Sequence, residues 1–142
     1  MIRQPGGDNG WDAVLAHRPP ESRDRVRERF QAAGVGPEQV RAALQDGGDG
    51  LYAAAVSNAA EWAKPYGGPL AVALLAAEVG ALTAHLTSRS SAIRAVAVEA
   101  LLDDYSAVTV ANRLGVSRQK VYDLARPGNT TTFVDHAPWR NR

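Results

Sequence analysis

Cysteine is absent from the 142 residues of the chain. Its absence excludes a disulfide framework, a thiolate nucleophile and a zinc site with cysteine ligands. The first twenty residues also lack an apolar run between a basic start and a small-residue cleavage site. We therefore expect a cytoplasmic protein without a secretory signal.

Patterns for metal, nucleotide or catalytic chemistry are missing as well. The three histidines, His17, His85 and His136, lie far apart in the sequence and outside any metal-ligand motif. Asp46 and Asp49 lack the alternating oxygen ligands and the closing Glu of a calcium loop. Gly67 and Gly68 are not followed by a phosphate-binding lysine. We expect no enzymatic activity, no metal and no cofactor.

A membrane-spanning segment is not expected. The longest apolar stretch runs from Pro69 to Leu86, which is short for a span, and it contains Glu78 where a charge is costly. Hydrophobic residues make up 45% and charged residues 22% of the chain, as in ordinary globular proteins. The length suits one compact domain or two small helical modules.

Charge is distributed unevenly, although the formal net charge is only +1. Residues 1–70 hold eight Lys/Arg and nine Asp/Glu, and residues 71–104 hold two and four. Residues 105–142 hold six Lys/Arg against two Asp/Glu. The C-terminal quarter could therefore carry a positive surface that attracts phosphate.

Helical patterns separated by Gly and Pro clusters predict an all-α protein, a multi-helix bundle. We expect helices at 11–17, 21–33, 37–45, 51–63, 70–87, 91–104, 107–114 and 118–126. These group into an N-terminal helical region (1–69), a long apolar helix (70–90), a tri-helical C-terminal unit (91–126) and an irregular basic tail (127–142). Only Thr130–Val134 resembles a strand.

The predicted helix 70–87 has one apolar seam, in steps of three and four residues. Its members are Val72, Leu75, Val79, Leu82 and Leu86. The seam is either part of the core of a single chain or a dimer interface, because a small monomer has difficulty covering so apolar a helix.

Residues 106–126 have the spacing of two short helices joined at a sharp corner. Ser106 and Ser117 stand at N-cap positions, and Ala111 is small enough for a close helix crossing. Gly115 can adopt the left-handed conformation that ends the first helix, which leaves Val116 to fill the turn.

The second of these helices has two distinct faces at about 100° per residue. The inner face is apolar and meets the first helix through Val110, Leu114, Val121 and Leu124. The opposite face carries the hydrogen-bonding side chains Arg118, Gln119, Tyr122 and Arg126.

This segment resembles the helix-turn-helix of bacterial DNA-binding proteins, through its A-x3-G-V spacing (Ala111, Gly115, Val116) and the apolar Val121 and Leu124. The resemblance implies that the second helix enters the major groove and the first crosses the DNA backbone. It assigns base reading to Ser117, Arg118, Gln119 and Tyr122. It assigns phosphate contacts to Thr109, Arg113, Lys120 and Arg126.

Individual side chains in this segment have chemistry suited to bases. Arg118 could donate two hydrogen bonds to guanine, and Gln119 could pair with adenine. Asp123 departs from the pattern, because a carboxylate near the groove repels phosphate or selects a cytosine amino group. The alternative is a three-helix unit in which the same spacing serves only for packing. This alternative explains the apolar positions but not the surplus of positive charge.

Two segments flank this unit. In the preceding helix, 91–104, we expect an apolar stripe to cover the pair: Ile93, Val96, Ala97, Ala100 and Leu101. The tail after Pro127 is an arm along DNA, a strap docked through Phe133 and Trp139, or a disordered end.

We therefore expect a sequence-specific protein for double-stranded DNA, a transcriptional regulator that binds as a homodimer. The N-terminal helices could bind a protein partner. The alternatives are a helical protein-protein interaction module, or the DNA-binding component of a recombination, replication or partition system.

Overall fold

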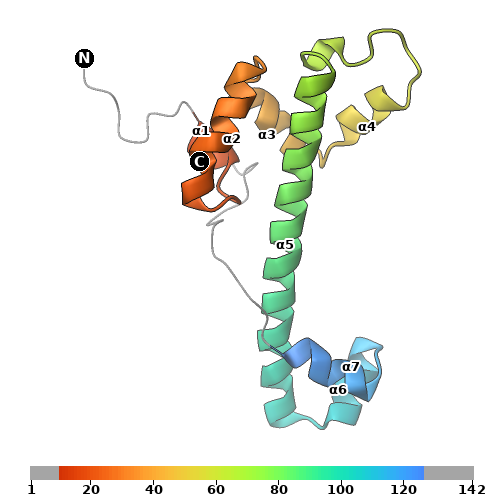
Figure 1. Cartoon of the computed structure of the whole chain (residues 1–142). Helices are drawn as coiled ribbons and strands as arrows, with labels where there is room; N and C mark the ends of the chain where they lie inside the picture. Colours follow the sequence, from red (N-terminus) through yellow and green to blue (C-terminus); the bar gives the residue numbers. More distant parts are fainter. Residues whose placement is uncertain (1–9, 127–142) are drawn as a thin grey trace. The chain divides into compact units, whose positions relative to one another are not determined.

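The computed structural model describes residues 10–126, and the regular elements in this range are all helical, which confirms the all-α fold class. The elements are α1 (Trp11–Val14), α2 (Pro20–Ala32), α3 (Pro37–Gln45), α4 (Asp49–Ala55), the 3-10 helix η1 (Lys64–Tyr66), α5 (Pro69–Asp104), α6 (Ala107–Leu114) and α7 (Arg118–Ala125) (Figure 1). The described chain forms two compact units, residues 10–83 and 84–126. The predicted strand at 130–134 and the tail lie outside the described residues.

The first unit has an apolar core that gathers helices α1 to α4 on the first part of α5. The rings of Trp11 and Phe30 stack with their centroids 5.9 Å apart. Leu15, Val40 and Leu75 are almost completely buried as well. Burial of side chains of this size supplies most of the stabilising free energy of a small unit.

Helix α3 begins at the predicted residue, and α2 begins one residue before its predicted start. Pro20 and Pro37 occupy first-turn positions, where a missing N–H costs no hydrogen bond. The Gly36 amide donates to the Gln39 side chain over 2.9 Å. Helix α4 is shorter than predicted and ends at Ala55, and Asn58 in the segment that follows has a left-handed φ of 61°.

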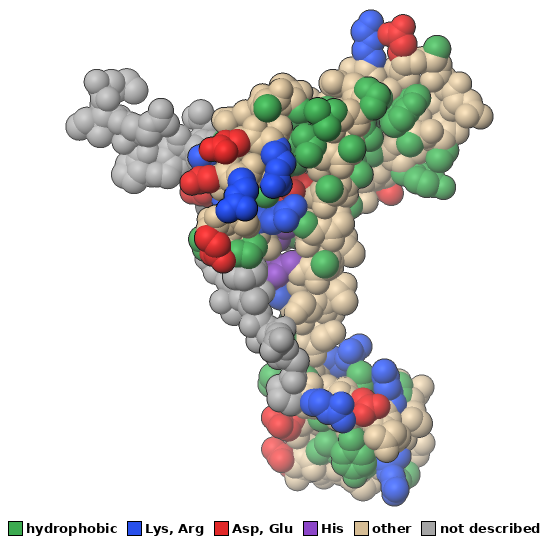
Figure 2. Space-filling view, viewed as in Figure 1, with side chains coloured by type: hydrophobic (Ala, Val, Ile, Leu, Met, Phe, Trp, Pro, Cys, Tyr) green, Lys and Arg blue, Asp and Glu red, His purple; other side chains and the backbone are tan. Residues whose placement is uncertain are grey.

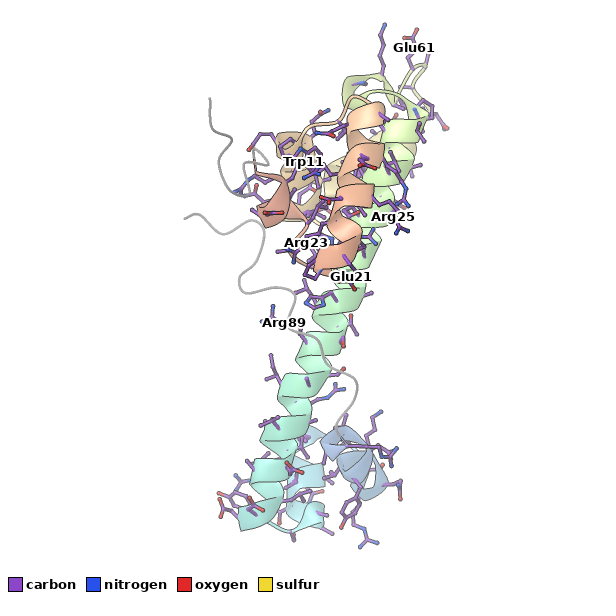
Figure 3. The ribbon with its side chains drawn as sticks, turned by 60° about the vertical axis from the view of Figure 1, so that its left-hand side comes forward. Trp11, Glu21, Arg23, Arg25, Glu61 and Arg89 are labelled. Carbon is purple, nitrogen blue, oxygen red and sulfur yellow. The ribbon has the colours of Figure 1, made fainter. Side chains whose placement is uncertain are left out.

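The connection between α1 and α2 is held by Arg23 (Figure 3). Its Nε donates to the carbonyl oxygens of Leu15 and Arg18, both over 3.1 Å. Its Nη2 donates to the Ala16 carbonyl over 3.2 Å. This guanidinium therefore binds three carbonyl groups of the segment that lies between the end of α1 and the start of α2.

Glu78 is the buried charge of this unit, with an exposed fraction of 2%. Arg18 binds it through two hydrogen bonds, and His17 Nε2 lies 2.5 Å from its Oε2 atom. Burial alone would raise the pKa of the Glu78 carboxyl, but the hydrogen bonds and charges of Arg18 and His17 outweigh burial and lower that pKa.

The predicted apolar seam of α5 lies largely in this same core. Val72, Leu75 and Leu82 are buried within a single chain, while Val79 and Leu86 are half-buried. Of the two interpretations of the seam, the structure supports the core helix, since these three side chains are not exposed to a second copy.

By length and composition, α5 is the one helix among residues 10–126 that could cross a membrane. A third of its most apolar stretch is buried inside the chain.

The prediction of two helices, 70–87 and 91–104, is wrong, because α5 continues through residues 88–90 without a break. This segment contains neither Gly nor Pro. The Ser90 hydroxyl donates to the Thr87 carbonyl over 3.2 Å, so that its polar group is satisfied within the helix.

The second unit packs the end of α5 against α6 and α7. Its core consists of Val98, Val110, Ala111 and Val121. The predicted covering stripe of α5 is mostly wrong: Ile93 and Val96 are 67% and 69% exposed, Ala97 and Ala100 are exposed, and Leu101 is half-buried. Ala95 and Val98 are the buried residues of this part of α5 instead, and Val98 belongs to the core. This part of α5 carries apolar residues on several of its sides, so their spacing alone does not show which side is buried.

Candidate nucleic-acid interface

The corner between α6 and α7 consists of three residues, Gly115 to Ser117. Gly115 has a φ of 72°, which confirms the predicted left-handed corner. The Val116 amide then donates to the Ala111 carbonyl over 3.0 Å and closes the end of α6. Because an L side chain is disfavoured at this φ, the direction of α7 depends on a glycine here.

Both predicted serine N-caps are present. The Ser106 side chain accepts a hydrogen bond from the Thr109 amide over 3.1 Å at the start of α6. The Ser117 side chain accepts one from the Lys120 amide over 3.0 Å at the start of α7. Each cap satisfies one of the amides that begin a helix without an internal partner.

The rotation of α7 about its own axis is set by the core. Val121 is completely buried, and Val116, Leu124 and Ala125 pack around it. Leu114 was predicted to face this core too, but it is 42% exposed.

The opposite face of α7 is exposed. The predicted base-reading side chains Ser117, Arg118, Gln119 and Tyr122 all lie on this surface. The predicted phosphate-contacting residues are more scattered: Lys120 lies on α7, Arg126 directly follows it, and Thr109 and Arg113 lie on α6. Of these four, only Thr109 is half-buried.

Positive charge dominates this surface. Asp123 forms an ion pair with Arg126, with 3.4 Å between its Oδ1 atom and Nη2. Within residues 10–126, Arg118 and Lys120 form no ion pair. Figure 2 shows Lys and Arg side chains over the visible face of this unit, with acidic side chains among them. The charge of the Asp123 carboxylate is thus partly neutralised by Arg126, directly after the same helix.

One contact of this surface was not predicted from the sequence. The Arg113 guanidinium carbon lies 5.0 Å from the centre of the Tyr105 ring, a cation-π distance. Tyr105 lies between α5 and α6, whereas Arg113 lies within α6. Because the two residues do not share a helix, helical periodicity in the sequence could not have indicated that they meet. The contact restrains an arginine that would otherwise sample many rotamers.

Titratable side chains elsewhere in the described part of the chain form one buried cluster and no metal-binding group. No group of three or more His, Asp or Glu side chains in residues 10–126 is placed to hold a metal ion. The buried cluster of His17, Arg18 and Glu78 was missed by sequence reasoning, because its partners are about 60 positions apart. It connects the α1–α2 segment to α5 and lies in the first unit.

Comparison of the chain with models of known protein families, with curated proteins and with solved structures gives no match.

Proposed function

We propose that residues 84–126 bind double-stranded DNA as a helix-turn-helix unit, with α7 in the major groove. The observation that carries this proposal is the orientation of α7. Val121 is fully buried, so that Arg118, Gln119 and Tyr122 face outward together. A helix held rigidly by its inner face and bearing arginine and amide groups on its outer face is suited to base edges.

The corner and the charge support the same proposal. Helix-turn-helix units commonly join their helices by a turn of three or four residues that contains glycine. Here the turn is Gly115–Ser117 and both helices have eight residues. Arg118 and Lys120 are available to phosphate or base oxygens without first breaking an ion pair within the described chain.

Direct titration tests the proposal. The full chain is titrated against a fluorescein-labelled random duplex at about 50 mM salt and again at about 200 mM, because phosphate contacts release counterions and weaken with salt. We expect binding that falls with salt, and loss of about tenfold or more in an Arg118→Ala/Lys120→Ala variant. Arg29→Ala, at an exposed arginine of α2, is the matched control and should bind as the wild type does. Absence of wild-type binding at low salt would overturn the proposal.

Selection of duplexes from a random pool then tests sequence specificity. One recognition helix offers few base contacts, so we propose a homodimer on a palindromic site in a regulator of transcription. A palindromic consensus supports this arrangement, and a single half-site contradicts it. Genomic footprints clustered at an origin or at the ends of a mobile element would instead indicate replication, partition or recombination.

A further inference from the structure

The second unit leaves one apolar face of α5 uncovered within the described chain. Ile93 and Val96 are 67% and 69% exposed, and Ala97 and Ala100 are exposed between and after them. These four positions follow the i, i+3, i+4, i+7 spacing of a single helical face. They form a stripe on the opposite side of α5 from the buried Ala95 and Val98, and Val98 packs in the core with α6 and α7.

The stripe is asymmetric in size along the helix. Its N-terminal half holds the two large side chains, Ile93 and Val96, and its C-terminal half holds Ala97 and Ala100. A second α5 that runs antiparallel, with the two-fold axis near Val96 and Ala97, places Ile93 opposite the alanine at 100. Large side chains thereby fill the space left by small ones, as in well-packed helix interfaces.

Charge is asymmetric in the same sense. Arg89 and Arg94 lie toward the N-terminal end of the stripe, and Glu99, Asp103 and Asp104 lie toward its C-terminal end. An antiparallel copy brings the acidic end of each helix alongside the basic end of the other. A parallel copy places like charges side by side, which is destabilising.

From these two asymmetries we infer that the Ile93–Ala100 face of α5 binds a second copy of this chain in antiparallel orientation. The partner is a second copy of the chain because the stripe, set against an antiparallel copy of itself, is complementary in both side-chain size and charge. This surface differs from the Val72–Leu86 seam, much of which is buried. The inference gives the proposed homodimer a contact surface, yet its test uses no DNA, so that its failure is distinguishable from failure to bind DNA.

Sedimentation of the full chain over a concentration series tests the interface. A Val96→Glu substitution places like charges together at the two-fold axis, and we expect the dimer to weaken by about 100-fold or more. Val108→Glu is the matched control, because Val108 is also an exposed valine of the second unit, on α6. Equal dimerisation of the two variants, or a wild type that is monomeric throughout, overturns the inference.

Orientation is tested by disulfide trapping, since the chain has no cysteine of its own. At about 1.5 Å of rise per residue, the two copies of residue 97 lie about 1.5 Å apart along the helix axis, and those of residue 104 about 22 Å apart. A disulfide requires Cα atoms within about 7 Å. We expect Ala97→Cys to cross-link to its own copy and Asp104→Cys not to do so. Cross-linking of both variants would indicate a parallel pair. An Ala97→Cys thiol that neither cross-links nor reacts with a maleimide would indicate that the chain itself covers this face. Either result overturns the inference.

Discussion

The guanidinium of Arg18 donates two hydrogen bonds to the carboxylate of Glu78, which is 60 positions away in the sequence. The distances are 2.8 Å from Nε to Oε2 and 2.9 Å from Nη2 to Oε1. The Glu78 side chain is almost completely buried, so removal of Arg18 leaves a buried charge with His17 as its remaining partner. We expect Arg18→Ala to lower the free energy of unfolding by roughly 3 kcal/mol.

Urea denaturation followed by circular dichroism measures this loss. Arg25→Ala is the matched control, because Arg25 is exposed on α2 (Figure 3) and should change stability by less than about 0.5 kcal/mol. Similar losses in the two variants would contradict a structural role for the Arg18–Glu78 pair.

Glu78 also makes stability depend on pH. Its pKa is lowered in the folded chain, so that the unfolded chain binds the proton first as the pH falls. The contribution of Glu78 is therefore complete above the ordinary carboxyl pKa of about 4.5 and is lost as the pH falls through the lower folded value. Glu78→Gln removes the titrating group and should flatten this part of the pH profile, as measured by urea midpoints between about pH 5 and pH 2. Parallel profiles for wild type and variant would contradict the assignment.

Gly115 provides a test of the corner before α7. No atom lies within 4 Å of a Cβ added at this position, so the penalty of Gly115→Ala comes from its φ of 72° and not from a clash. We expect a loss of about 1 kcal/mol, with Gly115→Asn less affected because Asn tolerates this region better.

Gly80→Ala is the control for this change. Gly80 lies within α5 and an added Cβ meets nothing within 4 Å, so alanine should stabilise the helix by about 0.5–1 kcal/mol. Thermal unfolding of the three variants measures the signs. Stabilisation by Gly115→Ala would show that the corner is not held as described.

The proposed division of labour on α7 predicts two different DNA-binding defects. Arg118→Ala should weaken binding to the selected site by about 1–3 kcal/mol and relax one base position. Lys120→Ala should weaken binding to all sequences similarly and reduce the salt slope by about one. Anisotropy titrations on selected and random duplexes at several salt concentrations separate the two. If both variants lost the same binding free energy on both duplexes, the distinction between a base-reading and a phosphate-contacting residue would be contradicted.

Local chemistry accounts for most of what was predicted correctly. The helical class, the serine caps at Ser106 and Ser117 and the left-handed Gly115 depend on residues a few positions apart, and all are present. The burial of Val121 also followed from spacing within one short helix. The predicted break in α5 failed because polar residues at 88–90 do not by themselves end a helix that is stabilised on both sides.

The sequence by itself determined the all-α class, the sharp corner at Gly115 and the polar character of one side of α7, since backbone preference and helical period act over short distances. Only the tertiary structure decided which side of α5 is buried in each unit, that Arg18 and His17 meet Glu78, and that Arg113 lies over Tyr105. The physical reason is that α5 carries apolar residues on several faces, so that its partners select the buried side. Contacts between residues far apart in the sequence likewise leave no periodic pattern from which they could be predicted.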